Sequence, residues 1–567
     1  MPINITVNSC QECVVQLGTL STRGFAETAK SVIEKNGVRY QAITLQNPHT
    51  FSKWTLCFKI AFYSAMKIFN RASYARKLNE AKCAWREKQV SYVFTYPLTA
   101  DTSSAVSGKG IPQVGVSATA ASAQAIARAA FGWDSLVEKA LTQPIPTHNN
   151  RIATLGQTDE IRGQIVKQAK ETHPILHAKV WAFIDKFLDL KRMLGTKVEE
   201  KLYSTMTKED FVQRLLEKRP YTFWKQSDDV KLQNGKQIDN ATQLFDEIKD
   251  APLTAEINLK DYLSYDEMQL AAYLGVSTPT FFINNGNRHN MSLTDALSFE
   301  KSGVYVGMVG ARFERPNHME DCHMIVRPDR DSSNDLNRLW GEFIFSLQFC
   351  RLPSYKEASA EYKANKGRYI QLQDNLGNPV YFDTLVYRLA MTLRLEAFLL
   401  DANARAQKEG KLAYLHLVAL GCGEWSHVEG THLAYAFQNI QVGIYYELLQ
   451  KHKLANIGTL NFSRFDQMDK IYQLKQLHVE GAKRAIEIEF SKRNPADTLE
   501  GKDQKKLLIA MYECNSNSYP GNEFWINVLN TSGDSAAASC STIAELQNPL
   551  VNPYVSGDNV AVYSPSS

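Results

Sequence analysis

Short apolar runs alternate with longer segments of helical apolar spacing after Asp261, and this alternation constrains the fold more than any other feature. Short β-branched, aromatic and aliphatic runs are typical of buried strands, whereas apolar residues three and four positions apart are typical of helices. Strands that alternate with helices predict an α/β domain whose mixed sheet is covered by helices on both faces. The predicted strands are 280–283, 304–309, 414–420, 458–462, 485–490 and 506–512, and the predicted helices are 334–349, 383–407 and 431–452.

The 567 residues exceed what one hydrophobic core usually holds, so two or three domains are expected. The first part, 1–255, interleaves charged with aliphatic residues and is predicted to be mainly α-helical. Its predicted helices are 51–70, a segment that begins at Ala120, 161–194 and 208–218, with a linker rich in small residues at 98–116 and a turn at Asn234-Gly235. Residues 256–552 form the predicted α/β domain, and the polar segment 553–567 a flexible tail.

Charge and cysteine content exclude several classes of function. The 64 basic and 60 acidic residues nearly balance, and no long Lys/Arg run stands out, so nucleic acid is not an expected partner. Nine scattered cysteines indicate a reducing, cytosolic environment. Neither Cys10 with Cys13 nor His427 with His432 has the further ligands that a zinc site needs, so no metal is predicted. No apolar run reaches the roughly 18–20 residues of a membrane span, and Ser-Gly-Lys-Gly at 107–110 lacks the rest of a phosphate loop.

The first candidate for chemistry is the 421 loop, Gly421-Cys422-Gly423-Glu424-Trp425, which lies between a predicted strand and a predicted helix. Glycines let a backbone approach a diphosphate without interference from Cβ atoms, and a helix N-terminus carries about half a positive charge. The 421 loop is therefore a candidate diphosphate site. A tight turn with Trp425 plugged into the core would explain the same residues.

The second candidate is the 310 loop, residues 310–321, which follows the predicted strand 304–309. Its acids could act on a ribose or a departing group, and its arginines Arg312 and Arg315 could hold phosphate oxygens by charge-assisted hydrogen bonds. The acids are Glu314, Glu320 and Asp321. A surface loop linked by salt bridges is the alternative interpretation.

The third candidate is the 514 loop, residues 514–525, which follows the last predicted strand. It combines amides, hydroxyls and the carboxylate of Glu523 with aromatic residues that could stack on a base, a combination suited to sugar recognition. Beyond it, Asp534 precedes an alanine-rich helix and could bind ligand or cap that helix.

These three loops, in this order, resemble the MavL-like effectors of Legionella, a family whose macrodomain-like fold binds ADP-ribose and removes it from modified arginine. The matching segments are VGMVGARFERP, LVALGCGEW, and NSYPGNEFW followed by SGD, and together they cover about residues 279–552. The Gly-Cys-Gly turn is also similar, more distantly, to the diphosphate loop of poly(ADP-ribose) glycohydrolases.

The resemblance implies a mixed-sheet, three-layer, macrodomain-like domain and an ADP-ribosyl hydrolase that takes ADP-ribose as its ligand and needs no cofactor. An amide cannot act as a general base. The family's acidic pattern leads us to expect an aspartate where Asn515 stands, so either Glu523 takes that role or the activity is reduced. The implied catalytic candidates are Glu523, Asp534, Glu314 and Glu320, and the ligand-binding candidates are Gly421, Cys422, Gly423, Glu424, Trp425, Arg312, Asn515, Asn517, Ser518, Tyr519, Asn522 and Trp525.

The resemblance further implies secretion by a bacterium into the host cytoplasm and an ADP-ribosylated host protein, such as ubiquitin, as partner. Two other functions stay open at this point. One is a non-catalytic reader that binds ADP-ribose and recruits a host protein through residues 1–255. The other is an NAD-dependent ADP-ribosyltransferase, which needs a glutamate beside a nicotinamide pocket.

Overall fold

The computed structural model describes the backbone of strands at 3–6, 26–35, 38–46 and 91–97, together with residues 127–565 apart from 225–226, 242–244, 246–257, 295–297, 331–333, 348–349, 466–472 and 516. The chain divides into two compact units, residues 1–115 and 116–567. The predicted helix 51–70, the linker 98–116, the Cys10–Cys13 pair and the segment 107–110 lie outside the described residues. No helix of the described ranges is long and apolar enough to cross a membrane.

The described residues of the first unit form a four-stranded sheet of order β1-β4-β3-β2, so the prediction of mainly helical structure is wrong for these segments. β2 (Ala26–Lys35) and β3 (Val38–Gln46) are antiparallel and pair Lys35 with Val38, while β1 (Ile3–Thr6) is parallel to β4 (Ser91–Pro97). The missed signal is the dipeptide Asn36-Gly37 between two runs rich in β-branched residues, which is typical of a β-hairpin.

The second unit begins with helices, as predicted. They are α5 (Trp133–Leu141), α6 (Ile152–Leu155), α7 (Asp159–Glu171), α8 (Ala178–Leu194), α9 (Lys197–Tyr203) and α10 (Lys208–Glu217). However, the predicted helix 161–194 is interrupted by β5 (His173–His177), because Pro174 lacks the N–H that a continuous helix would need there. The small sheet β6 (Thr222–Trp224), β7 (Asp229–Lys231) and β8 (Gln237–Ile238) follows, and the predicted turn is confirmed by Gly235 at φ +82°.

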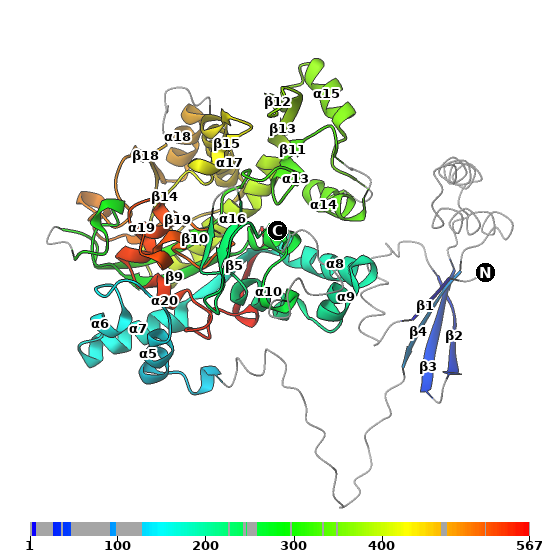
Figure 1. Cartoon of the computed structure of the whole chain (residues 1–567), viewed down its shortest axis with the longest axis horizontal. Coiled ribbons are helices and arrows are strands. Elements are labelled where there is room, and N and C mark those ends of the chain that lie inside the picture. Colours follow the sequence, from blue (N-terminus) through cyan, green and yellow to red (C-terminus); the bar gives the residue numbers. More distant parts are fainter. Residues whose placement is uncertain are drawn as a thin grey trace, which may run out of the picture. The chain divides into compact units, whose positions relative to one another are not determined.

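An eight-stranded mixed sheet forms the centre of this unit, in the order β18-β17-β14-β19-β10-β9-β5-β20 (Figure 1). The five strands from β18 to β10 are parallel, whereas β9 runs antiparallel to both of its neighbours. The α/β class and the mixed sheet are therefore confirmed. The strands are β9 (Gly275–Phe281), β10 (Ser302–Met308), β14 (Ala413–Leu417), β17 (Ile457–Ser463), β18 (Glu487–Ser491), β19 (Leu507–Glu513) and β20 (Ala561–Tyr563).

The sheet collects strands from all three predicted segments of the chain. β5 comes from the part before residue 255 and pairs with β9, while β20 comes from the predicted tail and runs parallel to β5. Asp401 joins these strands to a helix, because its carboxylate accepts hydrogen bonds from Ser277 Oγ at 2.6 Å and Tyr563 Oη at 2.8 Å. Residues on either side of the predicted boundaries thus share one sheet.

Alternate side chains of the strands enter cores on opposite faces of the sheet. On β19, Ile509 and Met511 join the cluster formed with α16 (Thr384–Lys408) and α17 (Ala434–Lys451). Ala510 and Tyr512 join a second cluster with α19 (Gly533–Cys540) and α20 (Ile543–Leu546). The remaining elements are α12 (Tyr265–Ala271), α13 (Asp321–Met324), α14 (Asp335–Phe345), α15 (Tyr355–Lys363), α18 (Leu474–Lys483), the sheet β11 (Ile325–Val326), β12 (Tyr369–Gln373) and β13 (Pro379–Asp383), and the hairpin β15 (His427–Val428) and β16 (Thr431–His432).

Candidate active site

Three neighbouring parallel strands bring the three predicted loops to one edge of the sheet. β14, β19 and β10 lie side by side, and the 421, 514 and 310 loops follow their respective carboxyl ends. Ligands of open α/β sheets bind beyond the carboxyl ends of the strands, where loops leave backbone groups available. This edge is therefore the candidate active site.

The 310 and 421 loops meet at a junction with the last residue of β19. A Cβ atom on Gly310 would lie 2.6 Å from Gly421 Cα and would also overlap Gly421 N and Glu513 Oε1. Gly421 itself has φ +73°, in the left-handed region that favours glycine. Its N–H donates a hydrogen bond to Glu513 Oε1. Gly421 N–H is thus already used within the protein, contrary to its expected contact with a diphosphate.

Glu513 is a site residue that the sequence predictions missed. Its side chain keeps part of its surface exposed, yet burial raises its pKa to about 7, while the Gly421 N–H is the one interaction that favours the ionised form. The signal that could have identified it is the alternation of side chains along β19. Glu513 follows Ile509 and Met511 at every second position, on the face of the strand that points into the core. A carboxyl group at a core-facing strand position, directly ahead of a loop, is typical of a functional site.

The outer part of the 421 loop is open to solvent. Gly423 and Glu424 are exposed, and no atom would lie within 4 Å of a Cβ on Gly423. Among the described residues, neither N–H of this pair donates a hydrogen bond. Trp425 is half-buried against the core cluster under α19, as the alternative interpretation expected, and Cys422 is half-buried. The loop can therefore offer two backbone donors to an anion.

The 514 loop uses most of its polar side chains to hold itself in place. Asn515 Nδ2 donates to Phe223 O at 2.9 Å, and Asn522 Oδ1 accepts from Phe223 N at 2.8 Å, so both amides clamp the loop to β6. Tyr519 Oη donates to Glu217 O at 3.0 Å, and Trp525 Nε1 to Pro520 O at 3.0 Å. The remaining two candidates, Asn517 and Ser518, are also buried. These six predicted ligand-binding residues therefore lie inside the protein and shape the loop.

Two predicted acids of this region lie in different environments. Glu523 is half-buried and accepts a hydrogen bond from Ser532 Oγ at 3.1 Å; burial, with the charge of Glu314, raises its pKa. Asp534 is buried, and its Oδ1 accepts from Gly521 N at 2.8 Å. Burial first, and the charge of Glu523 second, raise the pKa of Asp534 well above its ordinary value. Burial therefore favours the protonated form of Asp534, which supports the 514 loop through Gly521, and Ser532, not Asp534, is the N-cap of α19.

The 310 loop is anchored by the turn between β6 and β7. Arg312 Nη2 donates to Asp228 Oδ1 at 3.1 Å, its Nε donates to Glu314 Oε2 at 2.7 Å, and its guanidinium lies 4.2 Å from the centroid of the Phe223 ring. Glu314 remains half-exposed and raises the pKa of Glu523. The β6–β7 hairpin thus holds both the 310 loop and the 514 loop.

The other acids of the 310 loop point into the protein. Glu320 is buried and accepts from Arg394 Nη2 at 2.9 Å, and burial raises its pKa. Asp321 forms two hydrogen bonds with Arg327, at 3.0 and 2.8 Å. The structure does not place Glu320 with the exposed part of the site, and the interpretation of a salt-bridged loop describes this half of the 310 loop.

A buried arginine behind the 514 loop is a second residue that the predictions missed. Arg219 is 3% exposed, and among the described residues its Nε and Nη2 have no hydrogen-bond partner. Burial lowers its pKa, and the nearby Cys514 and Tyr512 oppose that shift. No sequence signal identified Arg219, because a single arginine before Pro220 is ordinary in a loop.

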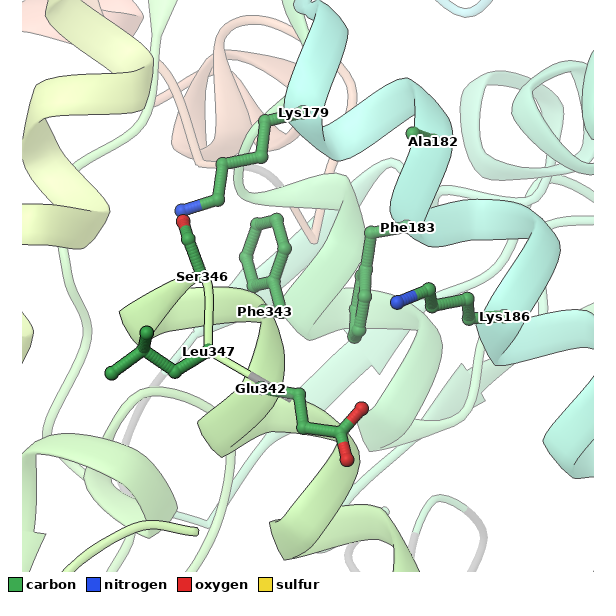
Figure 2. A pocket seen from close by; sticks show the side chains of 8 residues that line it. All are labelled: Lys179, Ala182, Phe183, Lys186, Glu342, Phe343, Ser346 and Leu347. Atoms are coloured by element: carbon green, nitrogen blue, oxygen red, sulfur yellow. The ribbon is translucent and has the colours of Figure 1, made fainter. Parts of the chain in front are cut away.

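A separate pocket of about 320 Å³ lies between α8 and α14, and no residue of the three loops lines it. Figure 2 shows the rings of Phe183 and Phe343 face to face on its wall, with centroids 4.2 Å apart. Lys179 Nζ donates to Ile344 O at 3.3 Å and lies above the Phe343 ring. Glu342 is the one acid that lines this pocket, so the pocket offers no pair of carboxyl groups. We therefore place the chemistry at the three loops.

Glu487, Glu489 and Asp503 form a group of three acids, within the described ranges, whose oxygens are close enough to hold a cation. Lysines already neutralise it, because Lys502 pairs with Glu487 and Lys506 pairs with Asp503. The other possible ligand pair from the sequence, His427 and His432, lies on the β15–β16 hairpin, where the two imidazole rings stack with their centroids 4.5 Å apart.

The chain matches the family described as ADP-ribosylhydrolase MavL-like over residues 136–567, a range that contains the whole sheet, the β6–β7 hairpin and all three loops. It is 29% identical over 444 residues to ADP-ribosylarginine hydrolase CG2909 of Drosophila melanogaster, which covers 74% of this chain and 85% of that protein. It is 31% identical over 441 residues to ADP-ribosylarginine hydrolase CG3568 of the same organism, and this match covers 72% of this chain and 80% of that protein.

Proposed function

The chain belongs to the MavL-like ADP-ribosylhydrolase family, and from this premise we propose that it hydrolyses the bond between ADP-ribose and an arginine side chain of a modified protein. The two fly relatives, whose names specify ADP-ribosylarginine, support the choice of linkage. The observation that carries the proposal is the gathering of three half-exposed carboxyl groups and a glycine loop at one edge of the sheet. The carboxyl groups are Glu314, Glu513 and Glu523.

Carboxylates suit an arginine-linked substrate because the guanidinium stays protonated in proteins and forms charge-assisted hydrogen bonds with them. Glu523 is positioned by Ser532, and its half-buried carboxylate would accept a hydrogen bond from a ribose hydroxyl or a water molecule. The exposed N–H groups of Gly423 and Glu424 would hold the diphosphate, and Trp425 would wall the adenine side. This arrangement supports a macrodomain-like assignment for the sheet, which we include in the proposal.

The decisive experiment incubates the purified protein with three peptides that carry ADP-ribose on arginine, serine or glutamate, and follows free ADP-ribose by chromatography. Release from the arginine peptide alone is the expected result. Release from none of the peptides, with retained affinity for ADP-ribose, would favour the non-catalytic reader. Formation of nicotinamide from NAD would favour the transferase.

Binding is tested separately by calorimetric titration with ADP-ribose, AMP and NAD. Gly423→Trp should abolish ADP-ribose binding by filling the outer loop, and Gly423→Ala is the matched control because nothing lies near its Cβ position. Normal affinity in the Trp variant would exclude the 421 loop as the diphosphate site.

Secretion by a bacterium, an effector role, and ubiquitin or another host protein as substrate are predictions of the resemblance alone. The two fly relatives are insect proteins, so these predictions need a test of their own. Mass spectrometry of proteins that lose ADP-ribose on treatment with the enzyme would identify the substrate protein.

A further inference from the structure

We propose that Glu513 is the general base of the hydrolysis, and that positions 310 and 421 are glycines because their backbones pack directly against its carboxylate. This inference rests on the proposed hydrolase function and names the group that moves the proton in it. The first argument is position. Glu513 ends the central strand of the three that carry the site loops, and it touches the 421 loop directly.

A general base needs one oriented oxygen and one accessible lone pair. The Gly421 N–H fixes Glu513 Oε1, and among the described residues no donor reaches Oε2. The residue is half-buried, at the end of its strand, and the proposed role assigns the water molecule to Oε2. A side chain on Gly310 would overlap Oε1, so the glycine junction protects this geometry.

The other acids at this edge are less suited to the role. Glu314 accepts a hydrogen bond from an arginine, Glu320 and Asp321 are buried in ion pairs, and Asp534 is buried with one oxygen held by the Gly521 N–H. Glu523 is accessible, but a serine hydroxyl and its own backbone already bond it, which suits it to hold a ribose hydroxyl or the guanidinium. Glu513 is the acid that combines a fixed orientation with a free oxygen.

The electrostatic surroundings of Glu513 permit proton transfer near neutral pH. Burial sets its pKa at about 7. The titratable groups that face it are Asp534 of α19, Cys514 of the 514 loop and Tyr387 of α16, and burial raises the pKa of all three, which disfavours a second negative charge beside Glu513. A base whose pKa lies near the working pH is half ionised and still accepts a proton efficiently.

The proposed step conserves atoms and charge. The bond between the anomeric carbon and the arginine nitrogen breaks, and its electron pair stays on nitrogen, so the guanidinium leaves as a neutral guanidine. The oxygen of water forms the new bond to the anomeric carbon, and the proton that it loses goes to Glu513 Oε2. Glu513 then returns this proton to the guanidine, which regenerates both the carboxylate and the guanidinium.

Glu513→Gln and Glu513→Ala distinguish a base from a residue that only positions the loop. The amide oxygen of the Gln variant can still accept from Gly421 N–H, so its ADP-ribose affinity should stay within a few-fold of wild type. Its kcat on the arginine-linked peptide should fall by about 100-fold or more. The kcat/KM of the wild type should decline as the pH falls below about 7, and the residual activity of the variant should lack this decline.

Each outcome decides one point. An active Gln variant with an inactive, weakly binding Ala variant would assign Glu513 a positioning role and overturn the proposal. Wild-type activity without the decline below neutral pH would also overturn it. If the wild-type protein releases no ADP-ribose, the proposed hydrolase function fails, and the role of Glu513 fails with it. If the wild type is active and only the expected behaviour of the Glu513 variants is missing, the general-base proposal alone fails.

Discussion

Arg312 of the 310 loop and Asp228 of the β6–β7 turn lie 84 positions apart in the sequence and form an ion pair inside the protein, with 3.1 Å between Nη2 and Oδ1. Asp228 is fully buried and also accepts a hydrogen bond from Tyr265. The guanidinium that shapes the 310 loop is therefore held by a distant hairpin, which in turn contacts the 514 loop.

Replacement of Asp228 by Ala should destabilise the protein by about 3–5 kcal/mol, because it removes the buried counter-charge of Arg312, which retains Glu314, and also the acceptor of the Tyr265 hydroxyl. Urea unfolding measures this change. Asp228→Asn is the matched control: asparagine keeps an acceptor and tolerates the left-handed backbone at φ 54°, so its loss should be clearly smaller. Equal stability of the Ala variant and the wild type would show that the ion pair contributes nothing.

Gly310→Ala should separate the 310 and 421 loops, because the new Cβ would overlap Gly421 and Glu513. We expect a loss of ADP-ribose affinity of at least 10-fold, about 1.4 kcal/mol, in calorimetric titration. Gly423→Ala should bind normally, since its Cβ meets no atom. Unchanged affinity in Gly310→Ala would mean that the junction is not part of the binding site.

The contribution of Glu513 to the stability of the protein should fall as the pH rises from about 4.5 to about 7, because Glu513 has a raised pKa in the folded state. In this window the folded protein binds more protons than the unfolded chain, so deprotonation favours unfolding. Glu513→Gln removes the cost of the buried charge and should be more stable than wild type by about 1–3 kcal/mol at pH 8, with little difference at pH 4.5. Denaturant titrations at both pH values test this, and a less stable variant at pH 8 would refute it.

Arg219→Met should stabilise the fold by about 1–3 kcal/mol, since it replaces a buried guanidinium that lacks hydrogen-bond partners at two nitrogens by an apolar side chain of similar length. Chemical denaturation gives the difference. The half-buried neighbour Lys218 provides the control, and Lys218→Met should change stability by less than about 0.5 kcal/mol. A destabilised Arg219→Met protein would indicate that the guanidinium interacts favourably with the groups around it.

The sequence predicted β10, β14, β17, β18, β19 and the order of the loops, because apolar runs ending in glycine or acidic residues are local signals. The predicted strand 280–283 overlaps only the end of β9, and β20 was not predicted. It missed β5, because this short strand lies between two helices and the helical apolar spacing on both sides of Pro174 was interpreted as one continuous helix. It missed Glu513, because the predicted strand ended one residue early. Asn515 and Asn522 looked like ligand-binding residues, but their partner is the backbone of Phe223, about 300 positions away, and no local pattern reveals such a contact.

The β6–β7 hairpin also fixes when the site can form during synthesis. Its hydrogen bonds to the loops span 84, 292 and 299 residues, so the hairpin leaves the ribosome long before the 514 loop exists. Contacts of such separation form late in folding, after local helices and hairpins. A nascent chain can therefore carry much of its secondary structure while still lacking any catalytic capacity, and activity should emerge only with the final tenth of translation.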